Sequence, residues 1–530
     1  MMYEKSKSEK LDIELFKNPT SEYRGAPFWS WNSYLEKNRL KKQIGIFKEM
    51  GFGGFHMHSR TGLEDKYLGK SFMEAIRFCA DEAEKEKMLA YLYDDDRWPS
   101  GAAGGLISVK PENRAKFLKF TSEPVEDKTV SFNEAYHTGD PCLYRVFDVV
   151  FNDDGVMESY KTIDESQQAQ GVKRYAYIYS QPLTQWYNGY TYGNTLSKSV
   201  MQEFVNMTHE KYKETVGDKF GKSIKTIFAD ESQYTMKLAA QSATKPGRSG
   251  QVPWSMDFEE DFYQRYGYSI SERLPELFAE YADKRMFETR LNFHNFVTDR
   301  FAEGFAETCS EWCGKNGLML TGHLAAEDTL EGNNKYCGDI MRSLRFYGIP
   351  GIDILCDVTY LNTAKMAQSV SRQYGREGVL SELYGVMYWD FDFRGHKYQG
   401  DWQAALGITL RVPHLSMLSM AGEAKRDYPA SISYQSPWYE KYPLIEDHFA
   451  RLNTVLTRGK PTVNVAVIHP IESYYMFFGP DDKTLAKRRA MDGSYESLGR
   501  WLLAGAVDFD FVDEALLASF SEEQTGGELT

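Results

Sequence analysis

Short apolar runs that end in polar residues alternate with segments of helical periodicity along most of this chain. Each run has about the length of a buried strand, and the alternation of such strands with helices is typical of βα units. Eight runs fit this description, at residues 26–31, 51–58, 88–93, 226–231, 318–323, 351–353, 379–382 and 409–414. We therefore predict an α/β fold centred on a (β/α)8 TIM barrel at residues 22–459, preceded by an N-terminal extension at residues 1–21.

The alternation breaks after the third run. Residues 106–195 show the two-residue period of β-strands, most clearly at 143–151, and carry turn-forming Gly and Asp. A segment of this length without helical periodicity predicts a small β-rich insertion within the barrel. The helical pattern returns at residues 198–216, before the fourth strand.

The pattern changes again after residue 459. Residues 462–469 form a nearly continuous β-branched run, as in a strand inside a parallel sheet, and a helix ending near residue 503 leads to a further run at 507–512. Two strands and one helix cannot close a doubly wound domain. We therefore predict an incomplete Rossmann-like domain at residues 460–530 and expect the chain to be a truncated form of a longer protein. Open strand edges there favour either a homo-oligomer or local disorder.

Charge and composition exclude several classes of partner. The net charge is −14 without a cluster of Lys and Arg, which argues against nucleic acid and against an anionic membrane surface. The N-terminus mixes acidic and basic residues with no apolar stretch behind it, and no segment approaches the ~20 apolar residues of a membrane span. Six cysteines in 530 residues suit free thiols in a reducing compartment, so we expect a cytoplasmic protein.

The fourth and seventh runs end in acids, Asp230-Glu231 and Glu382. Strand tips converge on one face of a barrel, so these acids are predicted to meet, and a pair of carboxylates is what glycosidic bond cleavage requires. Successive side chains of a strand point to opposite faces, so we assign the general-acid role to Glu231, with its pKa raised by burial and by nearby Glu382 and Asp353. Glu382 is then the base or the nucleophile. As structural alternatives, the Asp-Glu pair would cap a helix and Glu382 would pair with an arginine.

Aromatic residues make up 15% of the chain and gather at the same predicted strand tips. Such rings pack against the apolar C–H faces of sugars, and neighbouring polar groups bind the hydroxyls. Trp31, Trp98 and Trp389 are flanked by polar groups and are predicted to contact substrate, whereas Phe28 and Tyr93 are predicted to be core. The predicted polar contacts with substrate are His56, His58, Asp94, Asp96, Arg97, Asp230, His323, Glu327 and Asp353.

The histidines support a competing hypothesis. His56 and His58 can face the same side of one strand, and with His323 and Asp353 they resemble the ligand set of metal-dependent barrel amidohydrolases. That set lacks a ligand on the first strand and a ligating lysine. A third hypothesis is a barrel that binds sugars without catalysis.

Four segments resemble the α-L-rhamnosidase-type glycoside hydrolases and their uncharacterised relatives, at residues 53–63, 93–105, 228–231 and 425–429, within a likeness that spans residues 22 to 515. The order of a barrel and then a Rossmann-like segment is also similar to β-galactosidases whose barrel is followed by an amidotransferase-like oligomerisation domain. The resemblance implies an acid on strand four, here Glu231, and a second carboxylate on strand seven, here Glu382. It also implies calcium as a candidate metal, whereas the residues themselves indicate no cofactor.

Together these observations predict a glycoside hydrolase, rhamnosidase-like in type, that acts on a small oligosaccharide or glycoside. Its expected partner is that small-molecule carbohydrate. The sugar, its anomer and the choice between retention and inversion are not determined by the sequence, although the resemblance favours inversion.

Overall fold

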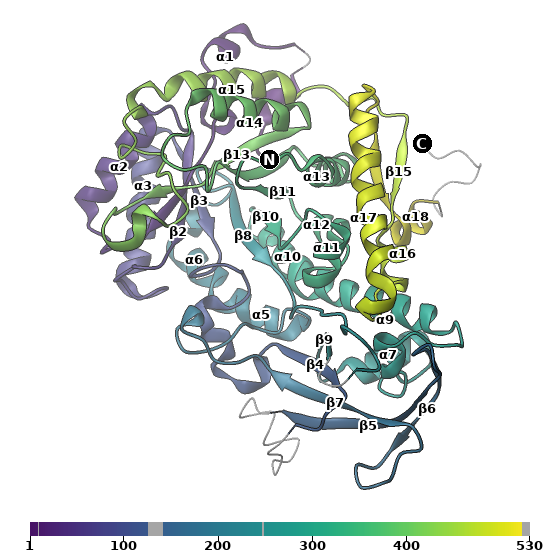
Figure 1. Cartoon of the computed structure of the whole chain (residues 1–530). Helices are drawn as coiled ribbons and strands as arrows, with labels where there is room; N and C mark the ends of the chain where they lie inside the picture. The colour runs from purple at the N-terminus through teal and green to yellow at the C-terminus, as the bar shows by residue number, and fades with distance from the viewer. Residues whose placement is uncertain (9, 126–140, 246–248, 522–530) are drawn as a thin grey trace.

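The computed structural model describes residues 1–521 except residue 9 and the segments 126–140 and 246–248 (Figure 1). Part of the predicted insertion and residues 522–530 of the predicted C-terminal domain lie outside the described residues. Within the described part of the chain, no helix combines the length and the apolar character needed to cross a bilayer; even the 24-residue α17 (Asp481–Ala504) carries many charged side chains.

The centre of the molecule is a parallel barrel, which confirms the fold predicted from the strand pattern. Nine strands form one sheet in the order β13-β12-β11-β10-β8-β3-β2-β1-β14. β13 pairs with β12 and β14 pairs with β1, so these two edge strands share the eighth position and nearly close the sheet. The barrel strands are β1 (Phe28–Trp31), β2 (Gly54–Ser59), β3 (Leu89–Tyr93), β8 (Thr226–Ser232), β10 (Met319–Leu324), β11 (Ile349–Ile354), β12 (Val379–Leu383), β13 (Ile408–Pro413) and β14 (Ser416–Met417).

Apolar side chains fill the inside of the barrel. Phe28, Tyr93 and Phe228 are fully buried there, in agreement with the core role predicted for the first two. The N-terminal extension closes the barrel at the N-terminal ends of its strands, where buried Tyr3 donates a hydrogen bond to Thr409 Oγ1 over 3.2 Å. The interior is therefore packed at its N-terminal end, and polar groups gather at the carboxyl ends of the strands.

Helices cover the outside of the barrel, each with one apolar stripe facing the strands. In α3 the buried residues Phe72, Ile76, Cys79 and Ala83 recur at the helical spacing of three to four. The helices that cover the strands are α2 (Lys37–Glu49), α3 (Lys70–Glu86), α5 (Lys198–Met207), α6 (His209–Val216), α9 (Met286–Phe301), α10 (Thr308–Lys315), α11 (Leu330–Tyr336), α12 (Ile340–Leu344), α13 (Leu361–Gln373), α14 (Phe393–Ala405) and α15 (Pro443–Leu456).

The predicted β-rich insertion is a five-stranded antiparallel sheet at one end of the molecule (Figure 1). Its order is β6-β5-β7-β4-β9, and its last strand comes from beyond barrel strand β8. The strand pattern of the sequence did not predict β9, because a five-residue segment that contains proline has a weak strand signal on its own. The strands are β4 (Lys116–Thr121), β5 (Cys142–Phe151), β6 (Met157–Ile163), β7 (Val172–Ser180) and β9 (Gly250–Trp254). Two further helices, α7 (Phe258–Tyr266) and α8 (Leu274–Phe278), follow β9.

The C-terminal segment lies along one side of the barrel (Figure 1). It contains a two-stranded parallel sheet of β15 (Ala466–His469) and β16 (Asp510–Asp513), with α16 (Ile471–Met476) and α17 between the strands and α18 (Glu514–Ser521) after them. β15 is shorter than predicted because its partner begins only at Asp510. Its side chains alternate between exposed and buried, so one face of this sheet is open, unlike a strand covered on both faces.

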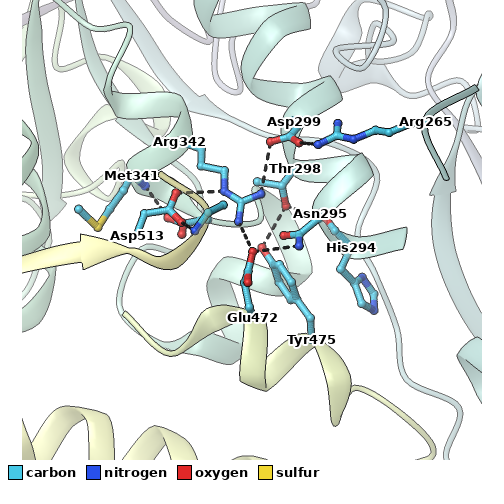
Figure 2. Close-up of polar contacts among 12 residues, drawn as sticks. Arg265, His294, Asn295, Thr298, Asp299, Met341, Arg342, Glu472, Tyr475 and Asp513 are labelled. Carbon is cyan, nitrogen blue, oxygen red and sulfur yellow. Dashed lines mark hydrogen bonds and ion pairs between the residues drawn. The ribbon is translucent and has the colours of Figure 1, made fainter. Parts of the chain in front are cut away.

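A buried charge network fastens this segment to the barrel helices (Figure 2). Arg342 of α12 lies between three carboxylates, with Nη2 2.8 Å from Glu472, Nε 3.0 Å from Asp513 and Nη1 3.3 Å from Asp299. Arg342 and Asp513 are almost completely buried. Because a buried charge is tolerated only when it is paired, this arginine fixes the position of β16 and α16 against the barrel.

We expect Arg342→Ala to weaken the attachment of the C-terminal segment by about 3–5 kcal/mol, because the substitution leaves the buried Asp513 without its cation. Hydrogen–deuterium exchange over residues 466–513 measures the effect as faster exchange. Arg500→Ala is the matched control, since Arg500 pairs with Glu496 on the exposed surface of α17 and should change exchange little. Equal exchange in Arg342→Ala and wild type would contradict the role given to the network.

Candidate functional site

A β-bulge lies at the carboxyl end of β8, the fourth barrel strand. In the pairing of β8 with β10, Gly322 is opposite Ala229 and Leu324 is opposite Ser232, so two residues of β8 face a single residue of β10. Gly322 permits this geometry, because its φ is +118° and a Cβ there would lie 1.8 Å from the Ala229 carbonyl oxygen. A bulge of this kind changes the direction in which the neighbouring side chains point.

The two bulged residues are the adjacent acids of the sequence prediction. Asp230 and Glu231 together lie opposite His323, and Glu231 adopts a left-handed backbone with a φ of +45°. The strict alternation of side chains assumed from the sequence is therefore interrupted here. Asp230 contacts His323, and Glu231 lines a cavity beside it, so both carboxylates belong to one site.

His323 lies between two carboxylates. Its Nε2 is 2.9 Å from Glu382 Oε2 and 3.2 Å from Asp230 Oδ1, and the other Asp230 oxygen accepts a 2.5 Å hydrogen bond from the Tyr93 hydroxyl. Burial opposes a charge on the imidazole, but the hydrogen bonds to Asp230 and Glu382 outweigh it and raise the pKa of His323 well above its usual value. The ring is therefore an imidazolium near neutral pH.

Glu382 stands at the end of β12, directly beside Asp353 of β11. Its second oxygen, Oε1, is 3.6 Å from Nε2 of His414, which follows β13. Burial first, and then the charge of Asp230, raises the pKa of Glu382 to about 7, while the hydrogen bond from His323 acts in the opposite direction. The Glu382 side chain is 6% exposed.

A cavity of about 480 Å³ opens beside this cluster, a volume within the range of small-molecule sites. Its lining contains the carboxylates of Glu231, Glu327 and Asp353, and also Gln233 and Tyr360. Burial, followed by the charge of Asp230, raises the pKa of Glu231 to about 7. Among the described residues no group donates a hydrogen bond to the Glu231 carboxylate, which distinguishes it from Glu382.

Glu327 and Asp353 form a second acidic pair on the cavity wall. The Glu327 carboxylate accepts hydrogen bonds from the backbone N–H of Leu324, at 2.9 Å, and of Asp353, at 3.1 Å. Burial raises the pKa of Glu327 to about 7 and that of Asp353 well above its usual value, where the charge of Glu382 adds to burial. A carboxyl group that keeps its proton can donate a hydrogen bond to a ligand in the cavity.

Two of the predicted contacts are enclosed by protein. Trp31 is fully buried and packs edge-on against Phe72 of α3, because it lies on the outward face of β1. Asp94 is fully buried as well and accepts a hydrogen bond from the Ser100 hydroxyl. The structure thus encloses both of these predicted substrate contacts, since a strand-tip position does not decide which face of the strand a side chain occupies.

The paired histidines of β2 are likewise enclosed. His56 is fully buried, with Nδ1 3.0 Å from the Ala26 carbonyl oxygen. His58 is 1% exposed, and its ring centroid lies 4.1 Å from that of Tyr93. Burial lowers the pKa of both rings, to about 3 for His56. Both imidazoles are therefore neutral and packed inside the protein. Their burial leaves them no surface for the predicted contacts with a sugar.

Asp96 and Arg97 lie apart from the carboxylate cluster, on a neighbouring cavity of about 430 Å³. Asp96 accepts hydrogen bonds from the Ser59 hydroxyl, at 2.6 Å, and from Arg97, at 2.9 Å. The two remaining tryptophan predictions lie at the rim. Trp98 is partly buried, and Trp389 is 39% exposed on the loop after β12.

The structure tests the metal ligands that the sequence suggested. Among the described residues, one group has His, Cys, Asp or Glu ligand atoms that all lie within 4.8 Å of one another, and it consists of Asp230, His323 and Glu382. It includes neither His56 nor His58, which contradicts the amidohydrolase ligand set. Calcium takes six to eight oxygen ligands. This group offers one oxygen each from Asp230 and Glu382, and both oxygens already contact Nε2 of His323. These donors do not fit the calcium implied by the resemblance.

Sequence reasoning missed several residues that the structure places at the site. His414 was predicted at the tip of the eighth strand, and the strand-tip argument used for Glu382 could have identified it. Arg60 and Tyr428 fall within two of the segments that carry the family resemblance, 53–63 and 425–429, and that likeness could have identified them. Trp186 comes from the insertion, and no local pattern in the sequence relates it to the barrel mouth.

No protein-family model matches the sequence, and no curated protein matches it significantly. Solved structures share its fold. A rhamnosidase from Novosphingobium sp. PP1Y matches with a TM-score of 0.63 and 14% identity over 94% of this chain and 64% of that one. A β-galactosidase from Halorubrum lacusprofundi matches with a TM-score of 0.53 and 11% identity over 92% of this chain and 66% of that one. A GH42 β-galactosidase from G. stearothermophilus matches with a TM-score of 0.51 and 10% identity over 92% of this chain and 65% of that one. This chain spans 64–66% of the length of these three proteins, and the likeness is one of fold.

The arrangement around His323 predicts a permanently charged ring. In selectively 15N-labelled protein we expect the His323 imidazole to remain protonated well above pH 6.5, because two carboxylates accept from it. In Glu382→Gln the pKa of His323 should fall, since one of these carboxylates is lost. His58 and His414, whose pKa values are lowered chiefly by burial, serve as internal controls and should stay neutral. A His323 ring that loses its proton below pH 6.5 would refute the ionic assignment.

Proposed function

We propose that this protein is a glycoside hydrolase in which Glu231 is the general acid and Glu382 is the general base or nucleophile. The observation that carries the proposal is the unequal environment of two carboxylates at the tips of barrel strands four and seven. Glu382 accepts a hydrogen bond from the His323 imidazolium, whereas Glu231 receives none from the residues that the structure describes and faces the cavity. The barrel fold shared with glycosidases is consistent with this reading but does not by itself define the reaction.

Glu231 is suited to hold a proton near neutral pH. Burial and the neighbouring Asp230 charge both favour its neutral form, and no hydrogen bond within the described residues stabilises the ionised one. In the reaction Glu231 would give this proton to the glycosidic oxygen as the bond to the anomeric carbon breaks. Glu231 leaves that step as a carboxylate, close enough to the imidazolium of His323 for the positive charge to stabilise it.

Glu382 is suited to the ionised role. His323 stabilises its negative charge by a hydrogen bond of 2.9 Å and also pairs with Asp230. Glu382 would either take a proton from water or attack the anomeric carbon directly. A carboxyl separation of about 5–5.5 Å corresponds to attack with retention, and about 6.5–9.5 Å corresponds to inversion through water. Proton NMR of the first product anomer distinguishes the two.

The cavity indicates which sugars to test first. Among the described residues the lining contains several carboxyl groups and no Lys or Arg, so the carboxylate of an anionic sugar such as a uronate would find no counter-charge there. Uncharged pyranosides fit this lining, because the acidic groups accept from and donate to hydroxyls. Since the rhamnosidase from Novosphingobium sp. PP1Y matches over 94% of this chain, α-L-rhamnosides are the first substrates to assay, and β-galactosides are the second.

On a panel of aryl glycosides we expect Glu382→Gln to lower kcat/KM for every substrate by at least about 10³-fold, because it removes the base or nucleophile. Glu231→Gln should lower kcat/KM by about 10²–10⁴-fold for poor leaving groups and much less for activated nitrophenyl groups, which depart without protonation. Initial rates across the panel measure both effects.

The matched control for both variants is Glu423→Gln, which changes a solvent-exposed glutamate on the rim and should leave every rate unchanged. Thermal unfolding and circular dichroism verify that each variant folds. Hydrolysis of no panel member by the wild type, or equal rates for wild type and Glu231→Gln on poor leaving groups, would count against the proposal. Binding of sugars without turnover would instead indicate a carbohydrate-binding barrel.

The two carboxylates predict a bell-shaped pH profile. Activity requires ionised Glu382, so it falls as the pH drops below the pKa of Glu382, and it requires protonated Glu231, so it falls as the pH rises above the pKa of Glu231. Both pKa values are raised to about 7, which places a narrow optimum near neutral pH.

With an activated substrate, Glu231→Gln should lose the alkaline limb. His323→Asn should move the acidic limb to higher pH, because the imidazolium normally lowers the pKa of Glu382. Profiles of kcat/KM between pH 4 and 10 measure these shifts, and an unmoved acidic limb in His323→Asn contradicts the role of His323.

A further inference from the structure

Three aromatic side chains from distant parts of the chain meet at the rim of the barrel. Trp98 follows β3, Trp186 belongs to the insertion, and Tyr428 follows β14. The ring centroids of Trp98 and Trp186 are 4.8 Å apart at 76°, and those of Trp98 and Tyr428 are 6.0 Å apart at 90°. Trp186 and Tyr428 are each 37% exposed. We refer to Trp98, Trp186 and Tyr428 as the aromatic corner.

The aromatic corner is held rigidly by polar contacts around it. The Trp186 indole N–H donates to the Trp98 carbonyl oxygen over 2.6 Å. The guanidinium of Arg60 lies 4.8 Å from the Trp98 ring and 5.4 Å from the Tyr428 ring, and it is fixed in turn by two 2.7 Å hydrogen bonds to Asp427. Rings fixed in this way lose little conformational entropy when a ligand packs against them.

The aromatic corner is contiguous with the proposed catalytic carboxylates. The Tyr428 ring lies 5.3 Å from that of His414, and His414 is 3.6 Å from Glu382. Burial raises the pKa of Tyr428, and the charge of Glu231 adds to that effect, so the phenol is within electrostatic reach of the proposed acid. The aromatic corner is therefore connected to Glu382 through His414 and lies within electrostatic range of Glu231.

This arrangement separates two chemistries. The cavity that contains Glu231, Glu327 and Asp353 offers polar groups for the hydroxyls of the sugar that is cleaved. The aromatic corner offers partly exposed aromatic rings. Such rings favour a ligand with an apolar ring face over a ligand that presents only hydroxyl groups. Arg60 contacts the aromatic corner from within the protein. Its charge is neutralised by the ion pair with Asp427.

Resting on the proposed function, we propose that Trp98, Trp186 and Tyr428 form the leaving-group subsite of this enzyme. The subsite takes a ring with an apolar face, supplied either by the C–H face of a second pyranose or by an aryl aglycone. The insertion, through Trp186, thereby contributes directly to substrate choice.

The test uses two leaving groups of different size on the same sugar, the one that the glycoside panel identifies. Trp186→Ala should lower kcat/KM by about five- to ten-fold for an aryl glycoside or a disaccharide, the size expected for the loss of one ring contact. It should leave kcat/KM for the glycosyl fluoride unchanged, because fluoride does not reach the corner. Trp186→Phe keeps a ring and should recover most of the loss.

The comparison of the aryl glycoside with the disaccharide identifies the ring that the subsite binds. If Trp186→Ala lowers kcat/KM for one of these two substrates alone, the subsite binds the leaving group of that substrate. Trp501→Ala is the matched control, because this tryptophan is 70% exposed on α17 and should alter none of the rates. Equal losses on the fluoride and on the larger substrates, or no loss on any of them, would overturn the proposal. If the wild type cleaves no glycoside, the proposed function fails by itself. The corner is then judged by calorimetric titration with a disaccharide and a phenyl glycoside, where Trp186→Ala but not Trp501→Ala must weaken binding.

Discussion

The bulge between β8 and β10 is the constraint on which the site depends. Because two residues of β8 lie opposite one residue of β10, Asp230 and Glu231 both reach the neighbourhood of His323 instead of pointing to opposite faces of the sheet. The geometry requires Gly322, where a side chain would collide with the Ala229 carbonyl. One extra residue in one strand thus converts a regular strand end into an acidic cluster with an internal cation.

The electrostatics of the site follow from that cluster. Asp230, Glu231, Glu327, Asp353 and Glu382 lie near a single imidazolium, and they are mostly shielded from water. One positive charge cannot neutralise five carboxylates, so several of them must hold protons near neutral pH. His323 lies within hydrogen-bonding distance of Asp230 and Glu382, and its hydrogen bond to Glu382 opposes the rise in the pKa of that carboxyl group. The two glutamates of the proposed reaction, Glu231 and Glu382, have identical side chains and differ only in these surroundings.

The parts of the chain outside the barrel act on the site in different ways. The insertion carries Trp186 to the rim, where the indole meets Trp98 of the barrel loop. The C-terminal segment is fastened through Arg342 to helices on the outer side of the barrel, and its contacts stabilise the scaffold around β10 and β11. The barrel therefore supplies the carboxylates, and the insertion supplies one ring of the proposed leaving-group subsite.

The sequence by itself determined the barrel, because eight apolar runs at βα spacing record which segments are buried on a repeating pattern, and local periodicity is a direct consequence of burial. It also placed Glu231, Glu382, His323, Glu327 and Asp353 at one end of that barrel, since parallel strands share the direction of their carboxyl ends. Tertiary structure alone decided the bulge, the burial of Trp31, His56, His58 and Asp94, and the approach of Trp186 and Tyr428. These features depend on strand register and on contacts between residues far apart in the chain, and a register shift of one residue leaves no trace in composition or periodicity.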